Sequence, residues 1–316
     1  MRVFILIVVL HGSLFSFGQK PTAFDPNVKT IYISNDTTQN FYLALEPEVN
    51  VKGLLVILAG FGGHPNEVLE ETDLPEKARK DGYLVVIPYL SILSFYDDSL
   101  SQQRLTALIP EVINKYKIPN GRFIIGGHSA GGNGALLYAE NAYRLNNKNV
   151  IKPNVVFGVD PPLDMKRLWN TFSYLDKIDF HKAATDESRY FLNRFRQQIG
   201  GTPSENPGQY EKISSFYRDA PNGGKIGYLK SVPIRLYCDP DIQWYIENRR
   251  ESYEQLNASD LSACIVQLRL LGNNRAELIT NIGKGYFPGG VRHPHGFSQL
   301  NADEFLLWAN KVIDKK

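Results

Sequence analysis

The sequence predicts an α/β protein with a mostly parallel, doubly wound sheet. One observation is that several short apolar runs are continuous rather than alternating, as in 54–58 and 83–88. Continuous runs are typical of strands that are buried on both faces. The other is that the segments between such runs carry apolar residues at helical spacing, as in 99–116. Alternation of buried strands and helices favours a parallel sheet with helices on both faces.

The expected elements follow one another along the chain. Strands 29–34 and 40–45 alternate in polarity and flank the polar turn 35–38, which predicts an antiparallel hairpin with one solvated face. Buried strands are then expected at 54–58, 83–88, 122–125, 155–159, 234–237 and 276–280. Helices are expected at 75–81, 99–116, 130–143 and 243–271.

The segment of about 163–230 interrupts this rhythm, because it contains no buried strand. It has helical patches at 165–174, 187–198 and 209–217, with Gly/Pro-rich joints between them. So long an insertion in a compact domain usually has its own structure or function. We therefore expect a helical cap over the carboxyl edge of the sheet.

The chain of 316 residues is long enough for one core domain with an inserted subdomain. Its net charge is only +2, without a cluster of Lys and Arg, so a nucleic-acid partner has no electrostatic support. The two cysteines, Cys238 and Cys264, do not make a disulfide framework. A bridge and two free thiols both remain open for them.

The first 18 residues are typical of a signal peptide. Met1 and Arg2 form a short basic start, residues 3–10 are apolar, and Ser16-Phe17-Gly18 suits cleavage after Gly18. An N-terminal anchor is the alternative, but polar residues 11–13 interrupt the apolar stretch, which is short for a membrane span. We expect a mature domain of residues 19–316, exported to the periplasm or the outside, without a stable membrane anchor.

The pentapeptide Gly127-His128-Ser129-Ala130-Gly131 matches the pattern G-x-S-x-G. It directly follows a buried strand and directly precedes a helix rich in small residues, which is the strand-turn-helix of a nucleophile elbow. The turn is so tight that side chains at its glycine positions would collide with neighbouring elements. The context therefore indicates Ser129 as a nucleophile.

At this point the chain resembles the α/β-hydrolase family over most of its mature length. The resemblance implies a triad in the chain order Ser, acid, His. Cys238-Asp239-Pro240-Asp241 after strand 234–237 is similar to the family's G-D-x-D and points to Asp241 as the acid. Asp239 and Asp160 remain as alternative acids, since some relatives place the acid after the preceding strand.

The resemblance also places the base in a loop after the last strand. His295 precedes Gly-Phe, a common setting of the family's histidine, and His293 is the alternative base. A His-x-His pair can also bind a metal, but no third ligand has suitable spacing. We therefore expect neither a metal nor a cofactor.

The expected roles follow from acyl-transfer chemistry. His295 would take the proton of Ser129, and Asp241 would hold the imidazole in the correct tautomer. The oxyanion needs two preorganised donors, for which the resemblance implies the N–H groups of Ala130 and Phe61. Phe61 lies in the loop 59–63, which resembles the family's H-G-x-G-G with Ala59 in place of His. Candidate substrate-binding residues near the site are His128, Trp169 and Trp244.

The leading hypothesis is an exported serine hydrolase that cleaves a carboxylic ester of a small molecule or a polymer. A serine peptidase or an acyltransferase would use the same triad in the same fold. A catalytically silent, hydrolase-like binding protein is the alternative from another class, although such proteins usually lack the serine or the histidine. The sequence does not indicate the acyl group, the alcohol or the oligomeric state.

Overall fold

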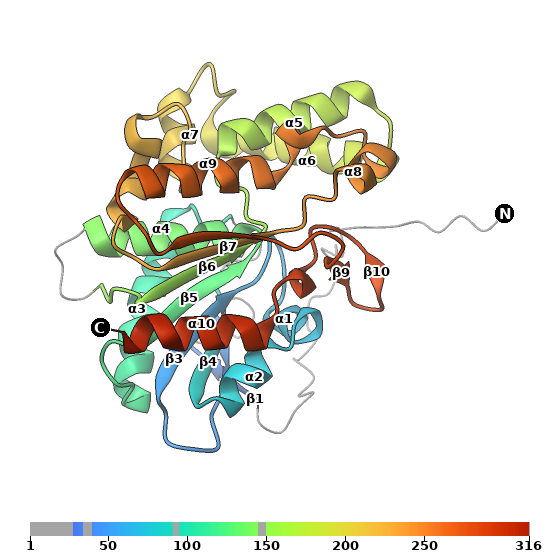
Figure 1. Ribbon diagram of the computed structural model, residues 1–316. Coiled ribbons are helices and arrows are strands. Elements are labelled where there is room, and N and C mark those ends of the chain that lie inside the picture. Colours follow the sequence, from blue (N-terminus) through green and yellow to red (C-terminus); the bar gives the residue numbers. More distant parts are fainter. Residues whose placement is uncertain (1–27, 34–39, 91–94, 145–149, 316) are drawn as a thin grey trace.

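The computed structural model describes residues 28–33, 40–90, 95–144 and 150–315. The expected signal peptide lies outside these residues. An eight-stranded sheet forms the centre of the molecule, in the order β1-β2-β4-β3-β5-β6-β7-β8 (Figure 1). Its strands are β1 (Val28–Tyr32), β2 (Phe41–Leu45), β3 (Gly53–Leu58), β4 (Tyr83–Tyr89), β5 (Phe123–His128), β6 (Val155–Val159), β7 (Ile234–Cys238) and β8 (Ala276–Thr280).

The strand directions confirm the predicted fold class. Six neighbouring strands from β4 to β8 run parallel, whereas β1 pairs antiparallel with β2 and β2 antiparallel with β4. The central strands β3, β5, β6 and β7 are buried along their whole length, as their continuous apolar sequences require. The antiparallel pairing of β1 and β2 is present, but the solvated face expected of both strands is not, because β1 is partly exposed and β2 is buried along its whole length.

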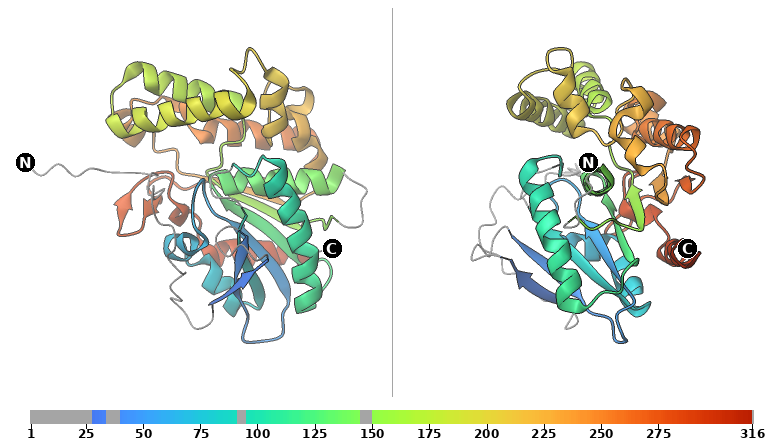
Figure 2. Two further views of the ribbon diagram at one scale, coloured as in Figure 1. Left: turned by 180° about the vertical axis from the view of Figure 1, so that it is seen from behind. Right: turned by 90° about the vertical axis from the view of Figure 1, so that its left-hand side faces the viewer.

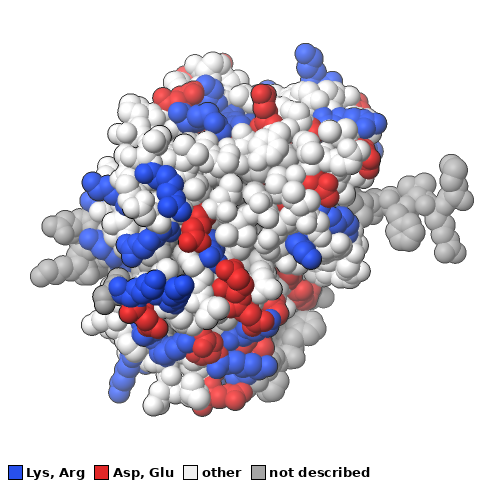
Figure 3. Space-filling view, in the orientation of Figure 1, with Lys and Arg blue, Asp and Glu red and all other residues white. Residues whose placement is uncertain are grey.

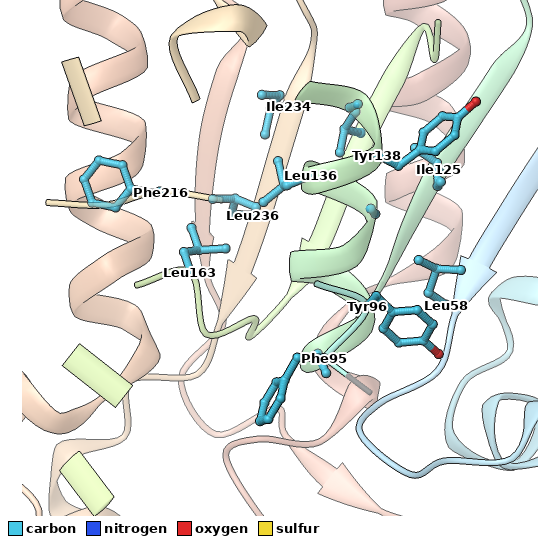
Figure 4. Close-up of a cluster of buried hydrophobic side chains, with 14 of the residues drawn as sticks. Leu58, Phe95, Tyr96, Ile125, Leu136, Tyr138, Leu163, Phe216, Ile234 and Leu236 are labelled. Carbon is cyan, nitrogen blue, oxygen red and sulfur yellow. The ribbon is translucent and has the colours of Figure 1, made fainter. Parts of the chain in front are cut away.

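Helices cover both faces of the sheet. One face carries α3 (Ser99–Tyr116), α4 (Ala130–Arg144) and α9 (Asn257–Leu270), and the other carries α1 (Pro65–Glu71), α2 (Leu74–Lys80) and α10 (Ala302–Asp314). In Figure 4, Leu136 of α4 points toward Ile234 and Leu236 of β7. The core is therefore divided by the sheet into two apolar layers.

The segment expected to form a cap contains α5 (Met165–Ile178), α6 (Lys182–Ile199), α7 (Pro207–Ile213) and η1 (Pro221–Leu229). α5 and α6 lie side by side above the carboxyl ends of the strands, and both views of Figure 2 show them as a separate layer. Aromatic residues of the two helices pack between them; Phe172 stacks on Phe191 with ring centroids 5.0 Å apart.

Several parts of the chain differ from the expectation, and the short helix α1 is one that the sequence did not predict. The long helix predicted at 243–271 is divided into α8 (Ile242–Asn248), η2 (Tyr253–Gln255) and α9. Arg250 adopts a positive φ of 59°, which is incompatible with a right-handed α-helix. Ser252 then caps the start of η2 in a capping box. The hairpin of β9 (Tyr286–Phe287) and β10 (Val291–Arg292), the turn η3 (Phe297–Gln299) and α10 were not predicted.

No described helix is long and apolar enough to cross a membrane. Basic and acidic side chains are interspersed over the face shown in Figure 3, without a field of one sign. Cys238 and Cys264 are both buried and free. The possible disulfide that the sequence left open is therefore not formed.

Candidate active site

Ser129 stands at the turn between β5 and α4, where the predicted strand-turn-helix is present. Its φ of 53° lies in the left-handed region, which is rare for residues other than glycine and is a form of strain common at functional sites. The Ser129 N–H donates to the carbonyl of Val159 on the neighbouring β6, at 2.9 Å. This bond fixes the turn against the sheet and leaves the side chain at the carboxyl edge.

The glycines around Ser129 are required by close backbone contacts. A Cβ at Gly127 would lie 2.4 Å from the carbonyl oxygen of Leu58, and a Cβ at Gly131 would lie 2.2 Å from the same atom. Both distances are far below a van der Waals contact. The two glycines therefore allow α4 to begin directly against the end of β3, as the sequence pattern indicates.

His295 contacts a carboxylate at the end of β6. Its Nδ1 lies 2.5 Å from Oδ2 of Asp160, which is almost completely buried. Asp160 has a positive φ of 46°, and Asn257 donates from Nδ2 to its carbonyl oxygen at 2.9 Å. Because Nδ1 faces the carboxylate, Nε2 is the nitrogen of His295 that is free to accept a proton from a nucleophile.

Within the described residues the expected acid, Asp241, makes no contact with His295, and the carboxylate that faces this ring is that of the alternative acid, Asp160. Oδ1 of Asp241 accepts from the N–H of Trp244 and caps α8, and Oδ2 accepts from Arg292 at 2.8 Å. The reason is local: the helix amide and Arg292 hold the Asp241 carboxylate at the start of α8, whereas Asp160 at the end of β6 faces the imidazole. A motif after β7 does not reveal these contacts.

Asp239, the other alternative acid, has a different task. Its buried carboxylate accepts from the N–H groups of Gly283, Lys284 and Gly285, at 3.1, 2.9 and 2.8 Å. Arg292 also lies 3.0 Å from it. Asp239 therefore anchors the segment that leads from β8 to His295.

His293, the alternative base, faces no carboxylate. Its ring stacks on Phe287 at 4.4 Å, and its Nδ1 accepts from the N–H of His295 at 3.2 Å. Burial and the nearby Arg249 hold the pKa of His293 well below its usual range. The ring is therefore neutral and supports the backbone of His295.

His128 precedes Ser129 and is buried. Its Nε2 donates to the carbonyl oxygen of His295 at 2.5 Å, and its Nδ1 lies 3.5 Å from Oε2 of Glu71. Burial alone lowers the pKa of His128, but Glu71 and the His295 carbonyl outweigh it and raise the pKa. No pattern in the sequence marks Glu71, since it lies on the short helix α1, which was not predicted.

The loop expected to supply an oxyanion donor lies beside Ser129. A Cβ at Gly60 would lie 3.7 Å from the Cβ of Ser129. The N–H groups of Phe61 and Ala130 donate to no backbone carbonyl within the described residues. Phe61 also packs on Phe95 and Phe191, with ring centroids 4.8 and 4.9 Å away. The loop is thus fixed by its aromatic side chain, and its amide lies at the same edge as Ser129.

A cavity of about 760 Å³ opens at this edge, beneath the helices of the cap. Ser129, Asp160 and His295 line its floor together with His128 and loop 59–63. Apolar side chains from the cap and its surroundings line one part, namely Phe95, Leu168, Phe172, Leu175 and Phe191. The remaining part is polar, with charged residues that the sequence did not single out: Arg167, Glu187, Arg249 and Glu251.

Two tryptophans, Trp169 and Trp244, were expected to bind substrate. Neither is among the described residues that line this cavity. Trp169 is buried inside the cap against Phe195 and Tyr210. Trp244 packs edge-on against His293, with ring centroids 5.0 Å apart. Both indole rings therefore serve packing.

No described residues form a group of three or more His, Cys, Asp or Glu side chains that could hold a metal ion. The His-x-His pair 293 and 295 is divided between two environments: His293 packs on Phe287, and His295 faces Asp160.

No family model matches the chain, and no curated protein matches it. Solved structures do resemble it. Esterase 2 of Thermogutta terrifontis has a TM-score of 0.56 at 13% identity, covering 92% of both chains. One of two esterases of Rhizomucor miehei has a TM-score of 0.62 at 14% identity, covering 91% of this chain and 84% of that one.

Carboxyl esterase 2 of Tuber melanosporum has a TM-score of 0.57 at 14% identity, covering 92% of this chain and 88% of that one. Further structures of the Thermogutta enzyme hold propionate or butyrate. At identities this low the similarity supports the fold, and the chemistry must be argued from the residues of this chain. With its sheet order, its elbow at Ser129 and these neighbours, the chain has the α/β-hydrolase fold.

Proposed function

We propose that the chain is a serine hydrolase that cleaves carboxylic esters through Ser129, His295 and Asp160. The observation that carries the proposal is the 2.5 Å contact between His295 Nδ1 and Asp160 Oδ2 at the floor of a cavity that Ser129 also lines. A serine hydroxyl is a weak nucleophile that needs a base held in one tautomer. The fold of known esterases supports this choice of reaction.

The reaction would proceed in two halves. Oγ of Ser129 attacks the ester carbonyl while Nε2 of His295 takes its proton, and the charge on the carbonyl oxygen is stabilised by the N–H groups of Phe61 and Ala130. His295 then protonates the departing alcohol, which leaves an acyl group on Ser129. A water molecule, deprotonated by His295, hydrolyses this acyl-enzyme and restores the serine. Asp160 stabilises the imidazolium in both halves.

The aromatic part of the cavity suits an acyl chain or another apolar group. Phe172 and Phe191 form a stacked pair on the cap, and Phe61 and Phe95 continue this wall toward Ser129. The Thermogutta esterase holds short acids such as butyrate, which fit a cavity of about 760 Å³ with ample room. We propose esters with small to medium acyl groups as substrates.

A fluorophosphonate probe tests the nucleophile. It is expected to label the native protein, and Ser129→Ala is expected to abolish labelling and ester hydrolysis together. Ser204 provides a matched control, because it is an exposed serine in the turn after α6. Ser204→Ala should label like the wild type; labelling that persists in Ser129→Ala would contradict the assignment.

We also propose that the protein is exported and loses residues 1–18. The support is the sequence of the leader, with its basic start, apolar stretch and small residues before Gln19. Mass spectrometry of the protein from the periplasm or medium should give a mature chain that begins at Gln19. An intact N-terminus on a cell-associated protein would contradict the proposal.

A further inference from the structure

The polar part of the cavity wall contains a carboxylate without a partner. Glu251 follows the end of α8, lines the cavity and is only 7% exposed. Its carboxylate forms no hydrogen bond or ion pair within the described residues. A buried carboxylate is costly unless it is paired or protonated. Burial accordingly raises the pKa of Glu251 to about 7, despite the nearby Arg249.

The neighbouring cations already have partners. The guanidinium of Arg249 lies 3.5 Å from Oε2 of Glu187, which also lines the cavity. The guanidinium of Arg167 is held by Asp260 and by Asn257, at 2.5 and 2.7 Å. One negative charge on this wall, that of Glu251, therefore has no counter-charge.

The rest of the cavity is also acidic. Among the described residues that line it, two are arginines, Arg167 and Arg249, and two are histidines that face Glu71 and Asp160, namely His128 and His295. The acidic residues outnumber them, namely Glu67, Glu70, Glu71, Asp160, Glu187 and Glu251. An anionic substituent on a substrate would be repelled by this excess. A neutral hydroxyl could donate one hydrogen bond to Glu251 but would leave its charge uncompensated. A cation satisfies both requirements.

We propose that Glu251 binds a protonated amine of the substrate, so that the enzyme prefers amino-substituted esters. This inference rests on the proposed esterase function and adds the chemical class of the substrate. The ammonium group donates to the carboxylate of Glu251, while the carbon chain that joins it to the ester lies along the apolar wall. A charge-assisted hydrogen bond in a water-poor site is among the stronger polar contacts.

Two matched pairs of esters test the inference on either side of the scissile bond. Ethyl 4-aminobutanoate and ethyl pentanoate differ by an ammonium in place of a methyl group in the acyl part. 2-(Dimethylamino)ethyl butanoate and 3-methylbutyl butanoate differ by a protonated nitrogen in place of a CH group in the alcohol part. At near-neutral pH, kcat/KM for the cationic member of at least one pair should exceed that for its neutral partner.

Glu251→Gln isolates the contribution of the carboxylate, because it preserves the shape of the side chain. For the preferred cationic ester, kcat/KM should fall by about 10- to 100-fold, the effect of losing a hydrogen bond to a charged group. For the neutral ester of the same pair, kcat/KM should change by less than about threefold. Glu254→Gln is the control, since Glu254 is exposed, lies three residues farther along in η2 and does not line the cavity.

The outcomes separate the inference from the function on which it rests. Hydrolysis of the neutral esters without a preference for the cations, or an equal loss for both members in Glu251→Gln, overturns the amine subsite and leaves the esterase intact. Hydrolysis of none of the four esters contradicts the proposed function itself.

Discussion

His128 holds the histidine of the candidate triad through the backbone rather than through the ring. Its Nε2 donates to the carbonyl oxygen of His295, at 2.5 Å. Its ring also stacks on Phe297, two residues farther along, with centroids 5.4 Å apart. The residue before the candidate nucleophile therefore positions the segment that carries the candidate base, although the two lie 167 residues apart in sequence.

The first prediction concerns this contact. In His128→Phe the ring stack remains possible but the donor is lost, so His295 should be less well oriented toward Ser129. We expect kcat to fall by about 10-fold with little change in KM, because a small misplacement of a catalytic group affects the chemical step. His128→Gln retains an N–H donor and should recover part of the loss. Equal activity of wild type and His128→Phe would contradict a positioning role.

The second prediction distinguishes the two acids. Asp160→Asn should reduce kcat by about 10²- to 10⁴-fold, because an amide does not stabilise the imidazolium or its tautomer. Asp241→Asn should keep kcat within about fivefold and lower the free energy of unfolding by about 1 kcal/mol, the usual effect of a weakened helix cap. Ester kinetics and urea unfolding measure the two effects. The reverse order of the two kcat values would restore Asp241 as the acid.

The third prediction concerns the elbow. Gly131→Ala would place a Cβ 2.2 Å from the carbonyl oxygen of Leu58, so the start of α4 must move away from β3. We expect the free energy of unfolding to fall by about 3 kcal/mol or more, as for other overpacked sites. Gly208→Ala is the matched control: this glycine lies in α7 with open space around it. That variant should be neutral or slightly more stable.

The fourth prediction is a pH dependence of stability at Glu251. Its pKa is raised from 4.5 to about 7 by burial, among the charges of Arg249, Glu187, Arg167 and Asp160. Below pH 4.5 the carboxyl group is mostly protonated in both the folded and the unfolded chain and does not lower the free energy of unfolding. As the pH rises toward 7 the unfolded chain ionises first, so stability is lost in this range.

Glu251→Gln removes this titration. Its free energy of unfolding should equal that of the wild type near pH 4 and exceed it by about 1–3 kcal/mol near pH 8. Urea unfolding at both pH values measures the difference. A constant offset between the two proteins across this range would contradict the linkage.

The sequence predicted the sheet and the nucleophile better than the partners of the nucleophile. Continuous apolar strands and the glycine pattern around Ser129 are local signals, and both reappear in the structure. The partner of His295 is a long-range property, because His295 and Asp160 lie 135 residues apart in sequence. A motif resembling G-D-x-D after β7 therefore favoured Asp241, whereas the geometry favours Asp160.

The sequence also did not reveal the break in the predicted helix 243–271, which depends on the backbone of a single residue. The periodicity of 243–271 continues across the break, but the backbone of Arg250 turns left-handed there and ends the helix. Glu251 enters the cavity wall at this break, and no local pattern marks it. Likewise, Trp169 and Trp244 are large aromatic residues near the site in sequence, yet their rings pack against Phe195 and His293.

Arg292 distinguishes the carboxylates that follow β7 from the one that follows β6. Its guanidinium lies 3.0 Å from Asp239 and 2.8 Å from Asp241, so the two carboxylates after β7 share one cation. Asp160, after β6, instead contacts the imidazole of His295 directly. Arg292 stands three residues before His295 in the same segment. One loop therefore sets both positions: it presents His295 to Asp160 and keeps Asp239 and Asp241 engaged with Arg292.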